Sequence, residues 1–423
     1  MTTPSVAIVG SGPSGCYLAQ ALRKQWSESE ISVYDRLPVP YGLVRYGVAP
    51  DHPGTKAIAR QFERLFTRDR VNFYGNVQVG HDITLDELRA AYDIVVLATG
   101  LYGDRAMNIP GETLAGVYRS GPLTRLLNDH PDEQGSEYRL GQRCVIVGNG
   151  NVAIDVLRLL SKSSEEFVGS EVSECGLSQV QRDALSRIDI VGRSPLSDAK
   201  FDTVMVKELA ELSGVNFIVH QTPQALAEQG PRGEVLQRLA EIESNQDRRL
   251  EVHFHFGWTP VQLEGATSVE RIHFSATGHE SVNLVLEADS VVTAIGFAAD
   301  SERDFNRDAL VGPDADVAAG KLDEGLYCTG WFKRGPRGTI PENRMDSKRV
   351  AECIIADFAE HDESRPGYSA VAVKLVEATD FAGWQRIDAC ETDSAPQDRL
   401  RRKLTDLSNM VNVARQCDSG EQI

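Results

Sequence analysis

Short apolar runs alternate with amphipathic segments along most of the chain, and one combination of the two occurs twice. Residues 6–9 (VAIV) predict a buried strand, which leads through a glycine-rich turn into a helix beginning near Pro13. The run ISVYDR predicts the next strand, which ends at Asp35. The same strand–turn–helix pattern returns at 144–160, and RIDIVGRS supplies its second strand. This alternation of strands and helices is typical of an α/β fold with parallel sheets.

Three further strand-like runs end in small residues, at 91–100, 288–296 and 324–330. One dinucleotide-binding fold needs one set of such strands, and this chain shows two. We therefore predict an α/β protein with two Rossmann-like dinucleotide-binding domains, the second inserted into the first through the strands at 91–100 and 288–296. The expected division gives 1–106 and 297–423 to the first domain and 107–296 to the inserted domain.

Two segments show weaker patterns. Residues 161–187 interrupt the second nucleotide-binding pattern and are predicted to be loose surface structure. Beyond about residue 357 the chain shows mixed helical patterns and ends in the polar CDSGEQI, where we expect fraying.

Composition narrows the classes of partner and compartment. A formal net charge of −18 disfavours nucleic acid, whose phosphates would be repelled. No run of about 18 apolar residues is present, so we expect no membrane insertion. The N-terminal sequence enters a strand pattern within a few residues, which leaves no room for a signal peptide and predicts a cytoplasmic protein.

The seven cysteines are scattered and include no CxxC pair. This spacing predicts reduced, mostly buried thiols and no metal site. It also excludes a dithiol flavoenzyme of the thioredoxin reductase kind and an iron–sulfur cluster ligated by cysteines of this chain.

The first glycine-rich turn, GSGPSG, fits the GxGxxG fingerprint of dinucleotide-binding folds. Its first glycine permits a tight turn, its second lets the backbone approach a pyrophosphate, and its third lets helix and strand pack closely. An acid about twenty residues later, Asp35, suits two ribose hydroxyls, as in FAD or NAD. The residues expected to bind this nucleotide are Gly10, Gly12, Pro13, Ser14, Gly15 and Asp35.

The second turn, GNGNVA, fits the variant GxGxxA, so a second dinucleotide is expected. Two dinucleotides on one chain imply electron transfer between them, with FAD and a nicotinamide nucleotide as the natural pair. The strand after this turn ends in Arg193 and Ser194, with no acid. A guanidinium there suits a 2′-phosphate and favours NADP, the alternative being a solvated surface arginine.

Four sequence segments occur together and in a fixed order: GSGPSG, VPYGLVRYGVAPDHP, GNGNVAID and GWFKRGPRGTI. In their sequences and their order, these segments resemble the adrenodoxin reductase type of ferredoxin–NADP reductase, including its bacterial members. The resemblance covers most of residues 4–350, and WQRIDA extends it into the C-terminal part. It implies a two-domain FAD enzyme that takes hydride from NADPH and passes single electrons to a ferredoxin-type iron–sulfur protein.

The same resemblance implies where the FAD lies. Leu43 and its neighbours would contact the flavin portion, Val77 would lie near the adenosine half, and Trp331 would stack close to the ring. Three backbone amides would face the flavin, those of Gly338, Thr339 and Ile340. Backbone amides there would stabilise the negative charge of the reduced ring.

For NADP and for catalysis the resemblance implies further residues. His52 and Glu208 would form a polar pair near the flavin, with Asp155 close by, as the candidate catalytic group. His52 would either relay a proton or order its loop through a hydrogen bond. The residues implied for NADP are Asn149, Gly150, Asn151, Val152, Arg193 and Arg105.

Some positions depart from the family pattern. Aligned back from Phe201, Arg193 and Ser194 stand where two adjacent arginines are usual, so one phosphate clamp is missing and NADH remains an alternative donor. Lys200 is a candidate to supply the missing positive charge at the 2′-phosphate. Met205 stands where an acid is common, and Thr339 and Pro341 stand where smaller or more flexible residues are usual.

Two segments of the chain are locally basic despite its negative net charge. Residues 331–349 carry six basic and two acidic side chains, and RLRRK at 399–403 adds a second basic cluster. Either could dock an acidic carrier despite the net charge, although a solvated face is the alternative.

Two other functions are alternatives to a ferredoxin reductase. One is a monooxygenase or NAD(P)H oxidase with two dinucleotide folds, and the other is a flavin-based redox sensor.

Overall fold

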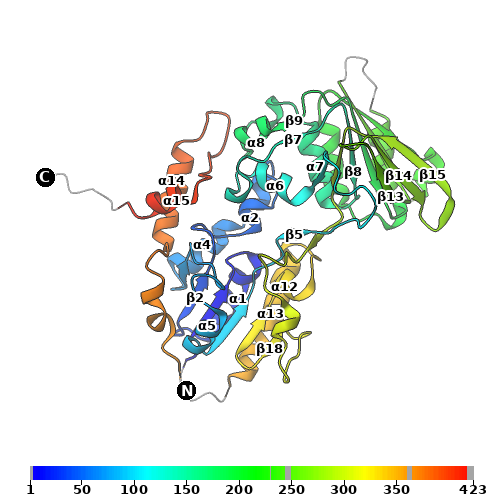
Figure 1. Cartoon of the computed structure of the whole chain (residues 1–423). Helices are drawn as coiled ribbons and strands as arrows, with labels where there is room; N and C mark the ends of the chain where they lie inside the picture. The colour runs from blue at the N-terminus through cyan, green and yellow to red at the C-terminus, as the bar shows by residue number, and fades with distance from the viewer. Residues whose placement is uncertain (1–2, 229, 243–248, 360–363, 417–423) are drawn as a thin grey trace. The chain divides into compact units, whose positions relative to one another are not determined.

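The structure is a computed structural model that describes residues 3–228, 230–242, 249–359 and 364–416. The chain divides into two compact units (Figure 1). The first contains Met1–Gly103 and Phe297–Ile423, and the second, inserted between them, contains Asp104–Gly296. Each unit is built on a six-stranded sheet with helices. The predicted fold class is therefore confirmed.

The sheet of the first unit has the strand order β18-β19-β4-β1-β2-β3. Its central strand, β1, is parallel to both of its neighbours. All four residues of β1 are buried, which explains why the sequence shows a continuous apolar run there rather than alternation. The strands are β1 (Val6–Val9), β2 (Ile31–Tyr34), β3 (Asn72–Tyr74), β4 (Ile94–Leu97), β18 (Lys321–Asp323) and β19 (Leu326–Cys328).

Two helices of the first unit, α1 (Pro13–Gln25) and α13 (Ile340–Asp357), pack against each other. The apolar side chains of Leu18, Leu22 and Ile354 place both helices in one core with the sheet. The other helices are α2 (Leu43–Tyr46), α3 (Pro53–Lys56), α4 (Ala59–Thr67), α5 (Leu85–Ala91), α12 (Gly330–Arg334), α14 (Phe381–Asp393) and α15 (Leu407–Ala414).

The sheet of the second unit has the order β11-β12-β10-β8-β16-β6, and its paired strands are parallel. An antiparallel three-stranded sheet packs against this six-stranded sheet. The two sheets share one core, which includes Val145, Val191 and Phe274. The six strands are β6 (Val117–Arg119), β8 (Arg143–Val147), β10 (Arg187–Gly192), β11 (Val215–Val219), β12 (Leu250–Phe256) and β16 (Ser290–Thr293). The smaller sheet contains β13 (Trp258–Glu264), β14 (Arg271–Ala276) and β15 (His279–Glu287).

The helices of the second unit lie between its strands along the chain, as in repeated strand–helix units. They are α6 (Ser120–Leu127), α7 (Asn151–Ser161), α8 (Glu174–Gln179), α9 (Thr203–Glu208), α10 (Pro223–Ala227) and α11 (Pro231–Ala240). None of the helices in the described ranges combines the length and the apolar character that crossing a bilayer requires.

The structure corrects two expectations. Residues 161–187 are not loose: they contain α8 and the short strand β9 (Val180–Gln181), and Phe167 is fully buried. Arg182 lies over the Phe167 ring. The charged side chains of this segment, which suggested exposure to solvent, therefore cover an apolar side chain instead. The chain also crosses between the units within β5 (Gly103–Asp104), after the strand at 91–100, whereas the second crossing, directly before β17 (Phe297–Ala298), agrees with the predicted boundary after residue 296. The segment CDSGEQI lies outside the described residues.

Candidate nucleotide-binding sites

Each of the three glycines in the first turn is glycine for a different physical reason. Gly10 has a φ of +109°, and a Cβ there would lie 2.5 Å from the Ala98 carbonyl oxygen. A Cβ on Gly15 would lie 2.0 Å from the Gly10 oxygen. Gly12, the N-cap of α1, has an ordinary φ of −67°, and nothing lies within 4 Å of a Cβ built on it. The protein itself therefore requires Gly10 and Gly15, whereas Gly12 leaves open space beside the N-terminus of a helix, where a pyrophosphate fits.

Asp35, directly after β2, is held beneath this turn. Its Oδ2 accepts hydrogen bonds from the Ser11 amide (3.0 Å) and the Ser11 hydroxyl, and its Oδ1 accepts from the Leu37 amide (3.1 Å). Burial raises the pKa of the Asp35 carboxyl, while these hydrogen bonds oppose the rise. The buried Val77 donates its amide to the Asp35 carbonyl oxygen (2.9 Å). Asp35 and Val77 are thus adjacent, and the contact of Val77 with an adenosine stays a prediction.

The segment after β2 packs directly onto the turn. The Tyr41 amide donates to the Ser11 hydroxyl (3.1 Å), and a Cβ on Gly42 would lie 3.2 Å from the Gly12 Cα. Gly42 has a φ of +48° and is the N-cap of α2, whose first residue is Leu43. Ser11 therefore joins Asp35 to this segment. Sequence reasoning missed Ser11 because it stands at a variable position of the fingerprint.

A buried ion pair fixes the same segment to the C-terminal helices. The Arg45 guanidinium, 5% exposed, lies 2.5 Å from the fully buried Glu391 carboxylate on α14. Arg45 also lies over the Trp384 ring, and Lys56 donates to the Arg45 carbonyl oxygen (2.7 Å). The loop that leads to His52 is therefore anchored at its middle.

A second segment approaches the first turn from β19. Gly330 has a φ of +67°, and a Cβ there would lie 2.1 Å from the Ser14 hydroxyl. The Ser347 hydroxyl on α13 donates to the Ser14 carbonyl oxygen (2.9 Å). Ser14 is thus held between α12 and α13, and Pro13 is buried at the first position of α1. Trp331 follows Gly330 directly on α12.

Several buried polar atoms in this unit have no hydrogen-bond partner in the described residues, and two of them lie in the segments around the first turn, the Trp331 indole nitrogen and the Thr99 hydroxyl. Buried donors are normally satisfied, so such atoms indicate a missing ligand. Thr99 follows β4, next to the carbonyl that contacts Gly10. Together with the open space at Gly12, these atoms fit a bound FAD. Sequence analysis missed Thr99.

The three amides expected at the flavin lie at the start of α13. Thr339 is the N-cap, and its amide donates to the Glu342 carboxylate in a capping box. Gly338 is exposed with a φ of +90°, and Ile340 is the first helical residue. The Thr339 amide therefore has an internal acceptor. Contact of these residues with a flavin stays a prediction.

The second turn repeats the geometry of the first. Gly148 has a φ of +129°, and its Cβ would lie 2.2 Å from the Ala294 oxygen. Gly150, the N-cap of α7, has a φ of −91°, and nothing lies within 4 Å of a Cβ built there. The Asn149 side-chain nitrogen is buried and has no partner in the described residues, and Gly192 leaves room for it. This cradle fits a second dinucleotide.

The two residues that follow Gly150 begin α7. The Asn151 side-chain oxygen accepts a hydrogen bond from the Asp202 amide (2.7 Å), so this side chain fixes the N-cap of α9. Val152 lies in the first turn of α7, at the helix end whose free amides favour a phosphate.

Arg193 and Ser194 follow β10, next to this cradle in the sheet. The Arg193 side chain is exposed, while its carbonyl oxygen accepts from Thr277 and that of Ser194 accepts from the Gly257 amide. The next residues enclose a pocket of about 170 Å³. Its walls are Pro195, Leu196, Ser197, Gln221, Ala225, Phe256 and Gly257. An exposed guanidinium beside a pocket at the carboxyl ends of the strands suits an adenosine 2′-phosphate.

The expected catalytic residues lie in both units. In the second unit the buried Arg158 contacts Asp155 (2.7 Å) on α7 and Glu208 (3.6 Å) on α9, so it brings the two acids together. Sequence analysis missed Arg158. His52 is the half-buried N-cap of α3 in the first unit, so its pairing with Glu208 stays a prediction.

Arg105, which is expected to bind NADP, is exposed and follows β5. Its amide donates a hydrogen bond to the Gly296 carbonyl oxygen (2.9 Å).

Comparison with known proteins identifies the family of this chain. The family model described as pyridine nucleotide-disulphide oxidoreductase matches residues 4–311. The chain is 45% identical to cindoxin reductase of Citrobacter braakii, over 97% of this chain and 91% of that one. It is 32% identical to the mitochondrial NADPH:adrenodoxin oxidoreductase of Salvelinus fontinalis, over 98% and 92% of the two chains.

A solved structure gives the same result for the whole fold. The structure of Mycobacterium tuberculosis FprA in complex with NADPH has a TM-score of 0.87 and 30% sequence identity, covering 98% of this chain and all of that one. The chain therefore belongs to the pyridine nucleotide-disulphide oxidoreductase family and, within it, to the adrenodoxin reductase type of ferredoxin–NADP reductases.

Proposed function

We propose that this protein is an FAD-dependent ferredoxin–NADP reductase. It oxidises one NADPH to NADP⁺ and a proton, and it reduces two molecules of a ferredoxin-type iron–sulfur protein by one electron each. The observation that carries the proposal is the presence of two separate dinucleotide cradles in one chain, each with an open glycine at a helix N-terminus. Bound FAD supplies the step from two-electron to one-electron chemistry.

The residues of each unit have distinct tasks in this proposal. Gly12 and the N-terminus of α1 bind the FAD pyrophosphate, Asp35 binds its ribose, and the Trp331 indole donates a hydrogen bond to it. Gly150 and Asn149 bind the NADP pyrophosphate, and Arg193 binds its 2′-phosphate.

Anaerobic stopped-flow reduction tests the proposal. The purified yellow protein is mixed with NADPH or NADH, and flavin bleaching is followed before and after a ferredoxin is added. We expect fast bleaching by NADPH and fast reoxidation by the ferredoxin. Faster reoxidation by oxygen than by any iron–sulfur carrier would indicate an oxidase, and slow reduction by both nucleotides would indicate a sensor.

The two basic clusters differ as docking surfaces. In RLRRK, Arg401 contacts Asp388 (2.6 Å) and Glu391 (3.2 Å), Arg399 contacts Asp398, and Lys403 is buried. Much of this cluster is therefore engaged within the protein, and Arg402 is its exposed basic member. On α13 the exposed side chains Arg344, Met345, Lys348 and Arg349 share one helix face and form what we call the α13 basic face. Lys348 also contacts the exposed Glu352 (3.6 Å), so the two arginines carry most of the charge of this face. We assign docking of an acidic carrier to this face.

Charge reversal on the α13 basic face tests that assignment. We expect Arg344→Glu combined with Arg349→Glu to raise the KM for an acidic ferredoxin by about tenfold at low salt, because like charges slow association. The KM for NADPH should not change. Arg238→Glu, at an exposed position on α11, is the matched control. Equal effects of both variants, or no dependence on salt, would contradict docking at this face.

Replacement of His52 tests the role of the loop it ends. We expect His52→Gln to slow flavin reduction by NADPH about tenfold without releasing FAD, because Gln keeps a hydrogen-bond donor but cannot take up a proton. The readouts are the stopped-flow rate across pH and the FAD content. An unchanged rate and pH profile would assign His52 to loop order alone.

We also propose a cytoplasmic location, supported by the cysteines. The six described cysteines form no disulfide, and three of them, Cys16, Cys144 and Cys328, are buried. Burial raises the pKa of the Cys144 thiol to about 12, so this thiol is not reactive. Such unpaired cysteines suit a reducing compartment.

A further inference from the structure

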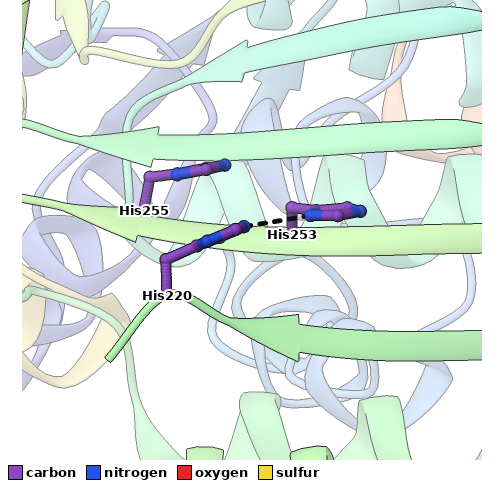
Figure 2. A group of neighbouring side chains, drawn as sticks. All are labelled: His220, His253 and His255. Atoms are coloured by element: carbon purple, nitrogen blue, oxygen red, sulfur yellow. Dashed lines mark hydrogen bonds between the residues drawn. The ribbon is translucent and has the colours of Figure 1, made fainter. Parts of the chain in front are cut away.

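Three of the histidines of the second unit gather on adjacent strands of its sheet (Figure 2). His253 and His255 stand two residues apart on β12, so both side chains point to the same face. His220 directly follows β11, and its amide donates to the Phe254 carbonyl oxygen on β12 (3.1 Å). One candidate ligand atom from each ring lies within 4.8 Å of the others. Neither nucleotide cradle uses these residues.

Carboxylates hold two of the three imidazoles. The Nε2 atom of His255 lies 2.8 Å from Asp189 Oδ1 on β10, and Asp189 is itself fixed by Arg187 (2.7 Å). The Nε2 atom of His253 lies 3.3 Å from the Glu251 carboxylate. When Nε2 donates to a carboxylate, Nδ1 carries the free lone pair. Metal-binding histidines are usually held by a carboxylate in this way.

The third ring closes the group. The Nδ1 atom of His253 lies 3.0 Å from His220 Nε2, shown as the dashed line in Figure 2. A distance of roughly 3.0–3.4 Å separates neighbouring ligand atoms around one ion with bonds of about 2.1 Å. His253 and His255 are 8% and 5% exposed, whereas His220 is exposed. The cluster therefore has two buried inner ligands and one ligand at the surface.

We propose that His220, His253 and His255 bind a divalent late transition metal ion such as Zn²⁺, with water completing the coordination. Imidazole nitrogen selects such ions over Mg²⁺ and Ca²⁺, which require oxygen ligands. Partial desolvation and the neighbouring His255 and His253 lower the pKa of His220 to about 4, and desolvation also lowers the pKa of His253, which favours the neutral imidazole that a metal ion binds.

Binding requires two of the rings to turn. The rings of His220 and His255 are stacked, with centroids 4.1 Å apart and planes at 12°, and the planes of His253 and His255 meet at only 10°. A metal ion lies in the plane of each ring that it binds, so the exposed His220 turns off the stack, and His253, whose partner Glu251 is exposed, turns toward the ion while His255 stays on Asp189. The exposed position of His220 makes it the residue to replace, because the substitution leaves the core intact.

Zinc titration of the untagged, FAD-loaded full-length protein tests the site. After chelator treatment and dialysis, we expect calorimetry and elemental analysis to give one Zn²⁺ per chain, and bound zinc to raise the Tm. His220→Gln should weaken zinc binding at least about tenfold and remove the rise in Tm. His255→Gln, if it retains FAD and its circular dichroism spectrum, should do the same.

His273→Gln is the matched control. His273 lies on β14 of the same unit and contacts one acid, Glu264 (2.8 Å), outside the cluster. We expect this variant to bind zinc as the wild type does. Fewer than one zinc per chain at saturation, or equal affinities of the wild type and His220→Gln, would overturn the site. Because no readout is enzyme activity, these results are independent of the reductase assignment.

Discussion

Gly12→Ala is expected to give a folded protein that no longer retains FAD. The backbone at Gly12 is one that any residue can adopt, and nothing in the protein lies within 4 Å of the added Cβ. The methyl group would instead occupy the space beside the N-terminus of α1 where the pyrophosphate has to approach. Overpacking of this kind costs about 1–3 kcal/mol, which weakens FAD binding by up to about a hundredfold.

The second unit supplies the matched control for this experiment. Gly150→Ala places the same methyl group at the equivalent position of the other cradle, where again nothing lies within 4 Å. We expect this variant to stay yellow but to be reduced slowly by NADPH. The measurements are FAD content after gel filtration, circular dichroism, and the stopped-flow rate as a function of NADPH concentration. Loss of FAD from both variants, or from neither, would contradict the assignment of one nucleotide to each unit.

Sequence reasoning succeeded where the signal is local. The turns at Gly10 and Gly148 could be predicted because one strand, one turn and one helix determine their conformation. Both have a positive φ and a backbone oxygen within about 2.5 Å of the missing Cβ. The fold class followed from finding two such units.

The residues that were missed depend on contacts between distant segments. Ser11 stands at a variable position of the fingerprint, and only the contacts with Asp35 and Tyr41 show its role. Arg158 reads as an ordinary residue of an amphipathic helix until α9 brings Glu208 to it. The histidine cluster brings together β12 and the residue after β11, and His220 and His253 stand 33 positions apart in the chain. The reading of 161–187 as loose failed because polar residues there cover Phe167 rather than face water.

Arg193→Ala is expected to distinguish the two nicotinamide nucleotides. The guanidinium is exposed directly after β10, beside the second cradle, so it is placed to pair with a 2′-phosphate. A hydrogen bond to a charged group contributes about 1.5–3 kcal/mol. We therefore expect kcat/KM for NADPH to fall by about ten- to a hundredfold and that for NADH to change by less than about twofold. A simple artificial acceptor in place of ferredoxin keeps docking out of the measurement.

The reverse substitution, Ser194→Arg, should restore the missing half of the phosphate clamp. The Ser194 carbonyl oxygen is held by the Gly257 amide (3.1 Å), and this backbone bond does not depend on the side chain. A second guanidinium should lower the KM for NADPH about tenfold and leave that for NADH unchanged, because only NADPH carries the 2′-phosphate. Equal effects on the two nucleotides in both variants would place the 2′-phosphate elsewhere, with Lys200 as the next residue to test. A wild-type preference for NADH that Ser194→Arg reverses would instead show that this one position sets the choice of nucleotide.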